Sequence, residues 1–165
     1  MSVDLIMEDA RWKTLNLLQI ANAAFKETLS HLDMRSENFI CCILACSSKE
    51  IKCLNAKFRG KNNSTNVLSF PSTSEIYKLK SSQKFEANID PFELGDIAIA
   101  YEVCKKEADF SKIDFEHHVY HLIIHSLLHL LGYDHEEEKN AAEMERIEVQ
   151  VLANLGISNP YFSNL

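Results

Sequence analysis

The 165-residue sequence is poor in the residues that bend or cross-link a chain, with four glycines, three prolines and five cysteines. No two cysteines have C-x-x-C spacing, which argues against a cysteine metal site, and we expect them to be small buried residues in a reducing cytosol. The longest apolar run, residues 39–46, is too short to cross a membrane and suits a buried strand. The N-terminus lacks the basic and apolar regions of a signal peptide.

Charge is distributed unevenly along the chain. The net charge of −7 argues weakly against a dedicated nucleic-acid binder. Residues 49–61 nevertheless hold five lysines or arginines and one glutamate, a net charge of +4, whereas residues 134–148 hold seven acidic and two basic residues, a net charge of −5. The sequence therefore predicts one basic and one acidic segment.

The hydrophobic pattern predicts one domain over residues 1–165 in the α+β class. We expect strands at residues 3–7, 39–46, 66–70 and 94–100, and helices at 11–30, 47–58, 102–109, 114–131 and 137–155. This order predicts one mixed, roughly four-stranded sheet with helices packed on it. Residues 71–91 have no periodicity and are expected to be a long surface loop.

Three histidines stand out at the end of the helix expected at 114–131. His125, His129 and His135 follow the spacing H-x3-H-x5-H, with Gly132 between the last two. Residues four apart share a helix face, and a glycine in the left-handed conformation can end the helix and return the chain. Three imidazoles with a fourth position open are typical of a catalytic zinc site, although such sites also accept nickel, copper or iron.

The same spacing matches the metal helix of the metzincin proteases, in which a glutamate directly after the first histidine acts as general base. Here that position is Ser126, which cannot accept a proton at neutral pH. The pattern therefore predicts a metalloprotease-like metal helix without the protease base.

The stretch 125–135 resembles the signature of the YbeY family, bacterial rRNA maturation factors that are single-strand-specific endoribonucleases with one metal. That signature reads roughly H-G-x-x-H-L-x-G-Y-D-H, and this chain departs from it at Ser126, where the family usually has glycine. Residues 54–71 resemble the family's L-N-x-x-[YF]-R…T-[DN]-V-L-S-F-P, and residues 94–99 resemble L-G-D-I-x-I. The resemblance covers about residues 39–157.

The resemblance implies a hydrolase that cleaves single-stranded RNA in 16S rRNA 3′-end maturation and ribosome quality control. It implies one zinc ion per chain on His125, His129 and His135, and a functional role for Arg59. A guanidinium can stabilise the negative charge that develops on phosphate oxygens during cleavage. We further expect Lys57 and Lys61 to follow the RNA backbone. The implied partners are rRNA and the small ribosomal subunit with its proteins, in the cytoplasm, and neither DNA nor a membrane.

Two rival functions stay open at this point. One is a metallopeptidase-like hydrolase, against which Ser126 argues. The other is a non-catalytic, zinc-containing ribosome assembly factor, which the negative net charge slightly favours. The roles of His121 and Asp134 are also open. His121 either neighbours the metal or is hydrogen-bonded elsewhere, and Asp134 either orients a histidine ligand or caps the last helix.

Overall fold

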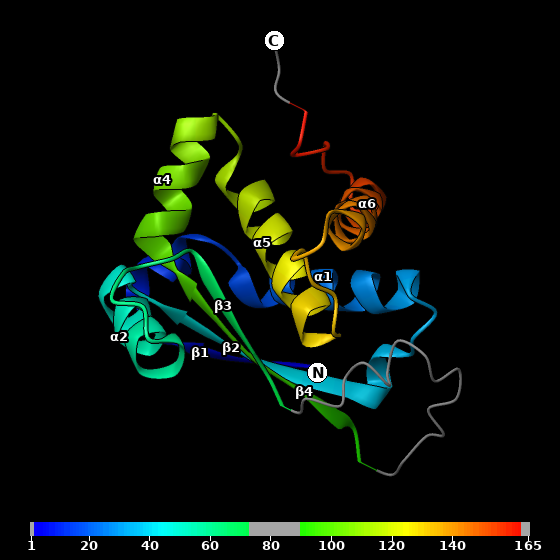
Figure 1. The fold of residues 1–165 in the computed structure, drawn as a ribbon, viewed down its shortest axis with the longest axis horizontal. Coiled ribbons are helices and arrows are strands. Elements are labelled where there is room, and N and C mark those ends of the chain that lie inside the picture. Colours follow the sequence, from blue (N-terminus) through cyan, green and yellow to red (C-terminus); the bar gives the residue numbers. More distant parts are fainter. Residues whose placement is uncertain (1, 73–89, 163–165) are drawn as a thin grey trace.

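The computed structural model describes residues 2–72 and 90–162, in which a mixed sheet carries helices on both faces (Figure 1). The strands are β1 (Val3–Met7), β2 (Phe39–Cys46), β3 (Val67–Pro71) and β4 (Phe92–Ala100). The helices are α1 (Leu17–His31), α2 (Ser48–Arg59), α4 (Tyr101–Ser111), α5 (Phe115–Leu130) and α6 (Glu138–Asn154), with short 3-10 helices η1 (Ala10–Thr14) and η2 (Ser36–Asn38). The predicted α+β class with one mixed four-stranded sheet is confirmed.

The sheet has the strand order β1-β2-β4-β3, with β3 on one edge. β1 and β4 are parallel to β2, whereas β3 runs antiparallel to β4. Gly95 of β4 lies against the end of β3 with φ +131°, and a Cβ built there would come within 2.2 Å of the Phe70 carbonyl oxygen. Only glycine fits this close approach, which gives a physical reason for the glycine of the L-G-D stretch.

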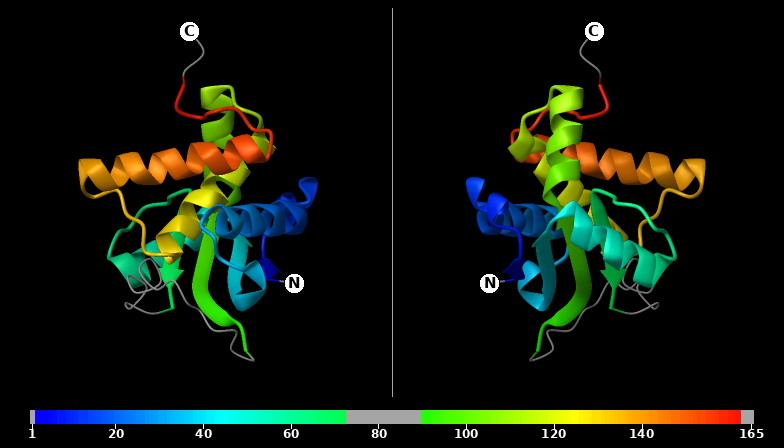
Figure 2. Two further views of the ribbon diagram at one scale, coloured as in Figure 1. Left: turned by 90° about the vertical axis from the view of Figure 1, so that its right-hand side faces the viewer. Right: turned by 90° about the vertical axis from the view of Figure 1, so that its left-hand side faces the viewer.

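Helices lie around the sheet (Figure 2), and alternating residues of β4 pack against different ones. Ile97 and Ile99 belong to the larger core, which includes buried residues of α1, α5 and α6. Ala98 and Ala100 belong to a smaller cluster with Ile51 of α2. The edge strand β3 therefore separates the face covered by α5 from the face covered by α2.

The predicted helix over residues 11–30 is wrong in its first part, which forms η1 and an extended residue before α1 begins. Trp12 of η1 is fully buried, and its Nε1–H donates to the Cys46 carbonyl at 3.0 Å. Leu15 is extended (φ −111°, ψ 151°). Asn16 then caps α1 by accepting from the Gln19 backbone N–H at 3.4 Å. The burial of the Trp12 indole and the cap at Asn16 make α1 begin at Leu17, although the apolar periodicity continues through residues 11–30.

Helix α2 begins as predicted, with the Ser47 hydroxyl accepting from the Glu50 backbone N–H at 3.3 Å. Periodicity predicts Ile51, Leu54 and Phe58 on its inner face, and for Phe58 this is wrong, because Ile51 is buried but Phe58 is 58% exposed. At the end of α2 the Phe58 ring meets Phe70 of β3, and the described residues place no further strand beyond that edge.

The expectation of buried cysteines holds for Cys41, Cys46 and Cys104, while Cys53 is exposed. Burial raises the pKa of the Cys41 and Cys46 thiols to about 12, so neither is a reactive thiolate at neutral pH. Most of the loop expected at 71–91 lies outside the described residues. Among the helices that are described, none has the length and apolar character needed to cross a membrane.

Candidate metal centre

Helix α5 and the turn after it place the three histidines. The sequence offers Ser111 or Asp114 as the cap of α5, and Asp114 is the one used, because its carboxylate accepts from the His117 backbone N–H at 3.1 Å. After Leu130 the chain turns back at Gly132, which has φ 90°. The Tyr133 backbone N–H closes this turn on the Leu128 carbonyl at 2.9 Å. The predicted reversal of the chain at Gly132 is therefore confirmed.

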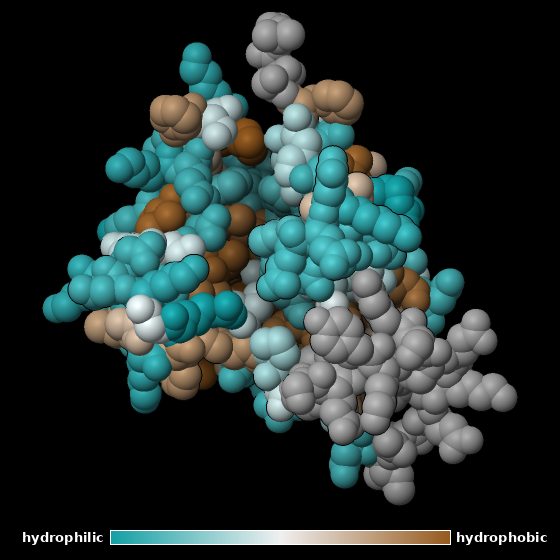
Figure 3. Space-filling model, viewed as in Figure 1, coloured by the Kyte–Doolittle hydropathy of each residue, from teal (hydrophilic) through white to brown (hydrophobic). Residues whose placement is uncertain are grey.

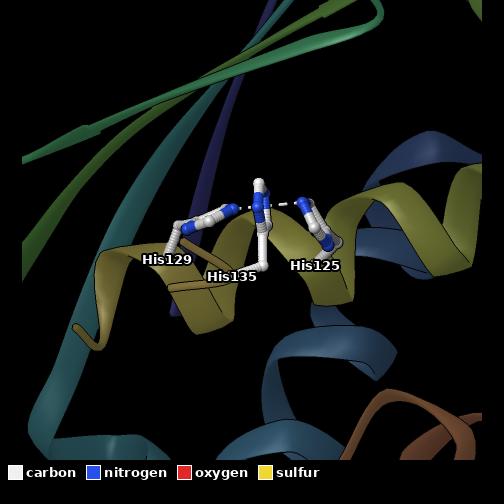
Figure 4. A group of neighbouring side chains, drawn as sticks. All are labelled: His125, His129 and His135. Carbon is white, nitrogen blue, oxygen red and sulfur yellow. Dashed lines mark hydrogen bonds between the residues drawn. The ribbon is translucent and has the colours of Figure 1, made fainter. Parts of the chain in front are cut away.

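The structure brings the three predicted histidines together (Figure 4). The ring centroids lie 4.6 Å apart for His125 and His129, 5.0 Å for His129 and His135, and 5.5 Å for His125 and His135. One nitrogen of each ring lies within 4.8 Å of a nitrogen of each of the others. His125 and His129 are half-buried and His135 is exposed, so this group of atoms is open on one side.

The outer partners of two rings fix which nitrogen carries the proton. His125 Nδ1 lies 2.6 Å from a Glu148 carboxylate oxygen, and His129 Nδ1 lies 3.0 Å from the Tyr133 carbonyl oxygen. Both partners can only accept, so both Nδ1 atoms donate, and in the neutral form of each ring the lone pair is on Nε2. These two Nε2 atoms face each other at 3.1 Å. With both rings in the neutral form that binds metal, the two lone pairs point toward the same position, where a cation would bind both.

The donor set fits a divalent metal ion. Zinc–nitrogen bonds of about 2.1 Å at tetrahedral angles separate two ligand nitrogens by about 3.4 Å, close to the distance between these Nε2 atoms. Burial, followed by the neighbouring His125, lowers the pKa of His129 to about 4. A lowered pKa keeps the imidazole neutral at pH 7, which is the form that binds metal.

Glu148 of α6 belongs to this centre, although no sequence motif marked it. Its side chain is only 1% exposed, and it accepts hydrogen bonds from His125 Nδ1 at 2.6 Å and from His121 Nε2 at 2.9 Å. The hydroxyl of Tyr161, near the C-terminal end, also donates to it. Burial alone would raise the pKa of Glu148, but these hydrogen bonds outweigh burial and lower it to about 2. Glu148 is therefore an ionised, buried acceptor that orients His125.

One signal in the sequence could have identified Glu148. It lies on the buried face of α6 with Met144, Ile147, Val151 and Leu152. A charged residue at such a position is rarely buried without a partner. The two alternatives for His121 do not exclude each other, because its ring is hydrogen-bonded to this carboxylate and also lies 6.5 Å from the ring of His125, centroid to centroid.

Arg59 is joined to the metal helix by two hydrogen bonds. Its Nη2–H donates to the Ser69 carbonyl of β3 at 2.7 Å, and the Ser69 hydroxyl donates to the Ser126 carbonyl of α5 at 3.4 Å. Ser126 directly follows His125, so this connection runs from the guanidinium to the helix that carries two of the histidines. Among the described residues, no carboxylate forms an ion pair with Arg59. Lys57 and Lys61 are exposed on either side of it.

Two further residues settle questions raised by the sequence. Ser126 is fully buried and its hydroxyl has no hydrogen-bond partner among the described residues, so it points into the packing of α5 and not toward a reacting water. Asp134 accepts from the Glu136 backbone N–H at 3.3 Å and from Asn140 Nδ2 at 3.4 Å. Both partners lie near the start of α6, but the N-cap residue of that helix is Glu137, so Asp134 is not the helix cap. Asp134 instead connects the turn before α6 to Asn140 in its first turn.

Comparison with known proteins gives consistent relatives. Residues 4–156 match the family model described as Endoribonuclease YbeY. A protein named Endoribonuclease YbeY from Jannaschia sp. (strain CCS1) is 39% identical over 98% of this chain and 100% of its own length. One of the same name from Ruegeria sp. (strain TM1040) is 41% identical over 98% of this chain and 96% of its own length. The solution structure of TM1509 from Thermotoga maritima shares the fold, with a TM-score of 0.57 and 21% identity over 93% of this chain and 91% of that one.

Proposed function

This chain belongs to the endoribonuclease YbeY family, and on that premise we propose that it cleaves phosphodiester bonds of single-stranded RNA at the centre formed by His125, His129 and His135. The observation that carries the proposal is the pair of Nε2 atoms 3.1 Å apart, in two rings whose Nδ1 atoms both donate to outer partners. His135 supplies the third nitrogen from the turn after α5.

The proposed cofactor is one zinc ion per chain, held by these three histidines. The chemistry that zinc supplies in such a site is polarisation of a phosphate oxygen and a lowered pKa of a bound water. The protein's own contribution is to fix the ligand orientation. Glu148 and the Tyr133 carbonyl hold two of the rings with their proton-free nitrogens directed at the same point.

Arg59 is proposed to bind the phosphate that is cleaved. One of its five N–H donors is recorded on the Ser69 carbonyl, which leaves donors for phosphate oxygens. A guanidinium held in place before the reaction stabilises developing charge without having to reorganise. Lys57 and Lys61 are proposed to bind neighbouring phosphates of the RNA backbone.

We further propose that the substrate is the 3′ end of 16S rRNA, processed in the cytoplasm on the small ribosomal subunit as part of maturation and quality control. This assignment rests on the family. The charge distribution supports it, because a protein with net charge −7 and one basic segment makes few phosphate contacts of its own. Binding to ribosomal partners would supply the specificity that these contacts lack.

Two variants test the proposal. His125→Ala removes a metal ligand, and both bound zinc and cleavage of a single-stranded oligoribonucleotide are expected to fall. Arg59→Glu is expected to lower the cleavage rate by about 10²-fold or more while zinc content, measured by mass spectrometry, stays near one per chain. Undiminished cleavage by folded His125→Ala would overturn the metal-dependent mechanism. Ribosome co-sedimentation without any nuclease activity in the wild type would instead identify a non-catalytic assembly factor.

A further inference from the structure

We propose that Phe58, supported by Phe70, is a stacking subsite for one base of single-stranded RNA beside the phosphate held by Arg59. The proposal rests on the proposed function and adds a binding contact to it. An aromatic face next to fixed cations is the combination that single-stranded nucleic acids use, because bases stack on the ring while phosphates bind the charges.

The aromatic pair lies at the end of α2 and on the edge strand β3. The Phe58 ring is 58% exposed and packs edge-on against Phe70, with centroids 5.4 Å apart and an interplanar angle of 64°. The two rings do not stack on each other, and more than half of the surface of Phe58 stays open to a ligand. The Lys57 ammonium lies 5.1 Å from the Phe58 centroid, and the Arg59 guanidinium carbon lies 5.9 Å from the Phe70 centroid.

The turn that follows holds this arrangement rigidly. The Lys61 backbone N–H donates to the Asn55 carbonyl at 3.2 Å, which closes the end of α2. The buried Asn55 side chain donates in turn to the Asn63 carbonyl at 2.9 Å, and the Ser64 hydroxyl donates to the Ser48 carbonyl at 2.9 Å. Little ordering of the backbone is therefore needed when a ligand binds, which lowers the entropic cost of binding.

Strand β3 connects the aromatic pair to the metal centre. Neighbouring residues of a strand point to opposite faces, and here Ser69 reaches α5 while Phe70 reaches α2. Because β3 is an edge strand, a chain that crosses this edge passes from the α5 face to the α2 face. Figure 3 shows this side of the molecule, where hydrophobic side chains are visible between hydrophilic surfaces over α2 and α6. A nucleotide with its phosphate at Arg59 can thus place an adjacent base at Phe58.

The basic charge of this surface distinguishes RNA from an acidic protein segment less strongly than the aromatic ring of Phe58 does. The basic segment 49–61 attracts any polyanion, but only a ligand with planar bases gains from the exposed Phe58 face. A probe without bases therefore separates the two contributions.

The first experiment replaces Phe58 by tryptophan (Phe58→Trp) and records indole fluorescence in stopped flow, before turnover. The wild type is a suitable control, because its single tryptophan, Trp12, is fully buried. Adding a single-stranded oligoribonucleotide is expected to quench the variant and not the wild type, and inorganic polyphosphate is expected to quench neither. Absence of quenching at RNA concentrations that saturate binding, as judged by fluorescence anisotropy, would overturn the stacking subsite.

The second experiment keeps the side chain apolar and removes its aromatic face. Phe58→Leu is expected to weaken oligoribonucleotide binding about 5- to 100-fold, with polyphosphate binding unchanged. The matched control is Phe110→Leu, since Phe110 at the end of α4 is 89% exposed and is not part of the proposed surface. Equal affinities of the two variants in a protein that binds and cleaves RNA would overturn the subsite alone. A wild type that neither binds nor cleaves RNA would overturn the proposed function as well.

Discussion

Among the histidine–carboxylate pairs of helix α5, His118–Glu107 and His125–Glu148 have similar geometry, and only the second belongs to the candidate metal centre. His118 lies 2.8 Å from Glu107 of α4, and His125 lies 2.6 Å from Glu148 of α6. Both carboxyl groups have a pKa below the usual range despite burial, because hydrogen bonds outweigh desolvation in each case. The pairing itself therefore does not distinguish a metal ligand from a structural histidine.

The difference lies in what surrounds each pair. Glu107 also accepts from the Asn66 side chain at 3.2 Å, so its network ties α4 and α5 to the start of β3. The nearest ring recorded beside His118 is that of His121, with centroids 6.4 Å apart. His125 instead has its second nitrogen 3.1 Å from that of His129. A histidine–carboxylate pair becomes half of a metal site only where the other imidazole nitrogen faces further donors.

The largest expected effect is on zinc binding, when a proposed metal ligand and a structural histidine are each replaced by alanine. His129→Ala is expected to weaken zinc binding by about 10²- to 10³-fold, in proportion to the share that one ligand contributes to a zinc site. His118→Ala is the matched control on the same helix and is expected to leave zinc affinity unchanged. Competition with a chromogenic chelator measures both. Equal losses in the two variants would mean that α5 as a whole, and not the donor geometry, determines metal binding.

A smaller effect is expected when each carboxylate is made neutral. In Glu148→Gln a single oxygen is left to accept from the donors of His125, His121 and Tyr161, and the NH₂ group that replaces the other oxygen can accept from none of them. The ring of His125 loses its fixed orientation, and zinc affinity is expected to fall about 10- to 100-fold.

The control is Glu107→Gln, which removes the other carboxylate and is expected to keep the wild-type zinc affinity. Thermal unfolding of both variants in the metal-free form shows whether either change acts through loss of the fold. Unchanged zinc affinity in folded Glu148→Gln would contradict the orienting role of this carboxylate.

The sequence predicted the local part of this arrangement well. Helix geometry predicts that His125 and His129 share a face, and glycine's access to positive φ predicts the turn at Gly132 that brings His135 back. Both predictions need only the residues 125–135. Strand β2 was predicted at its exact bounds because a continuous apolar run marks a strand buried on both faces.

The features that were not predicted depend on contacts between segments that are distant in the sequence. Glu148 and His125 are 23 positions apart in the sequence, and no local pattern predicts which residue the buried glutamate binds. Phe58 lies on the apolar face of α2 by periodicity, but the sheet ends at β3 and leaves the ring exposed. Trp12 interrupts the first predicted helix through a hydrogen bond to Cys46, 34 residues away. Periodicity identifies an apolar face and cannot say where the surface that covers it ends.

The smallest expected effect is on the free energy of unfolding and concerns the His118–Glu107 pair. Burial raises the pKa of Glu107, but hydrogen bonds from His118 and Asn66 outweigh it, so the pKa in the folded protein lies below the unfolded value of about 4.3. Such a group stabilises the fold above its unfolded pKa and loses this contribution as pH falls through its folded pKa. The side chain is 37% exposed, so solvent screening limits the contribution to about 1 kcal/mol or less.

Urea unfolding is therefore expected to show wild type slightly more stable than Glu107→Gln at about pH 7, with the difference shrinking below about pH 4. A difference that grows on acidification would mean that Glu107 is strained in the fold, and the two pairs on α5 would then differ in energetics as well as in their neighbours.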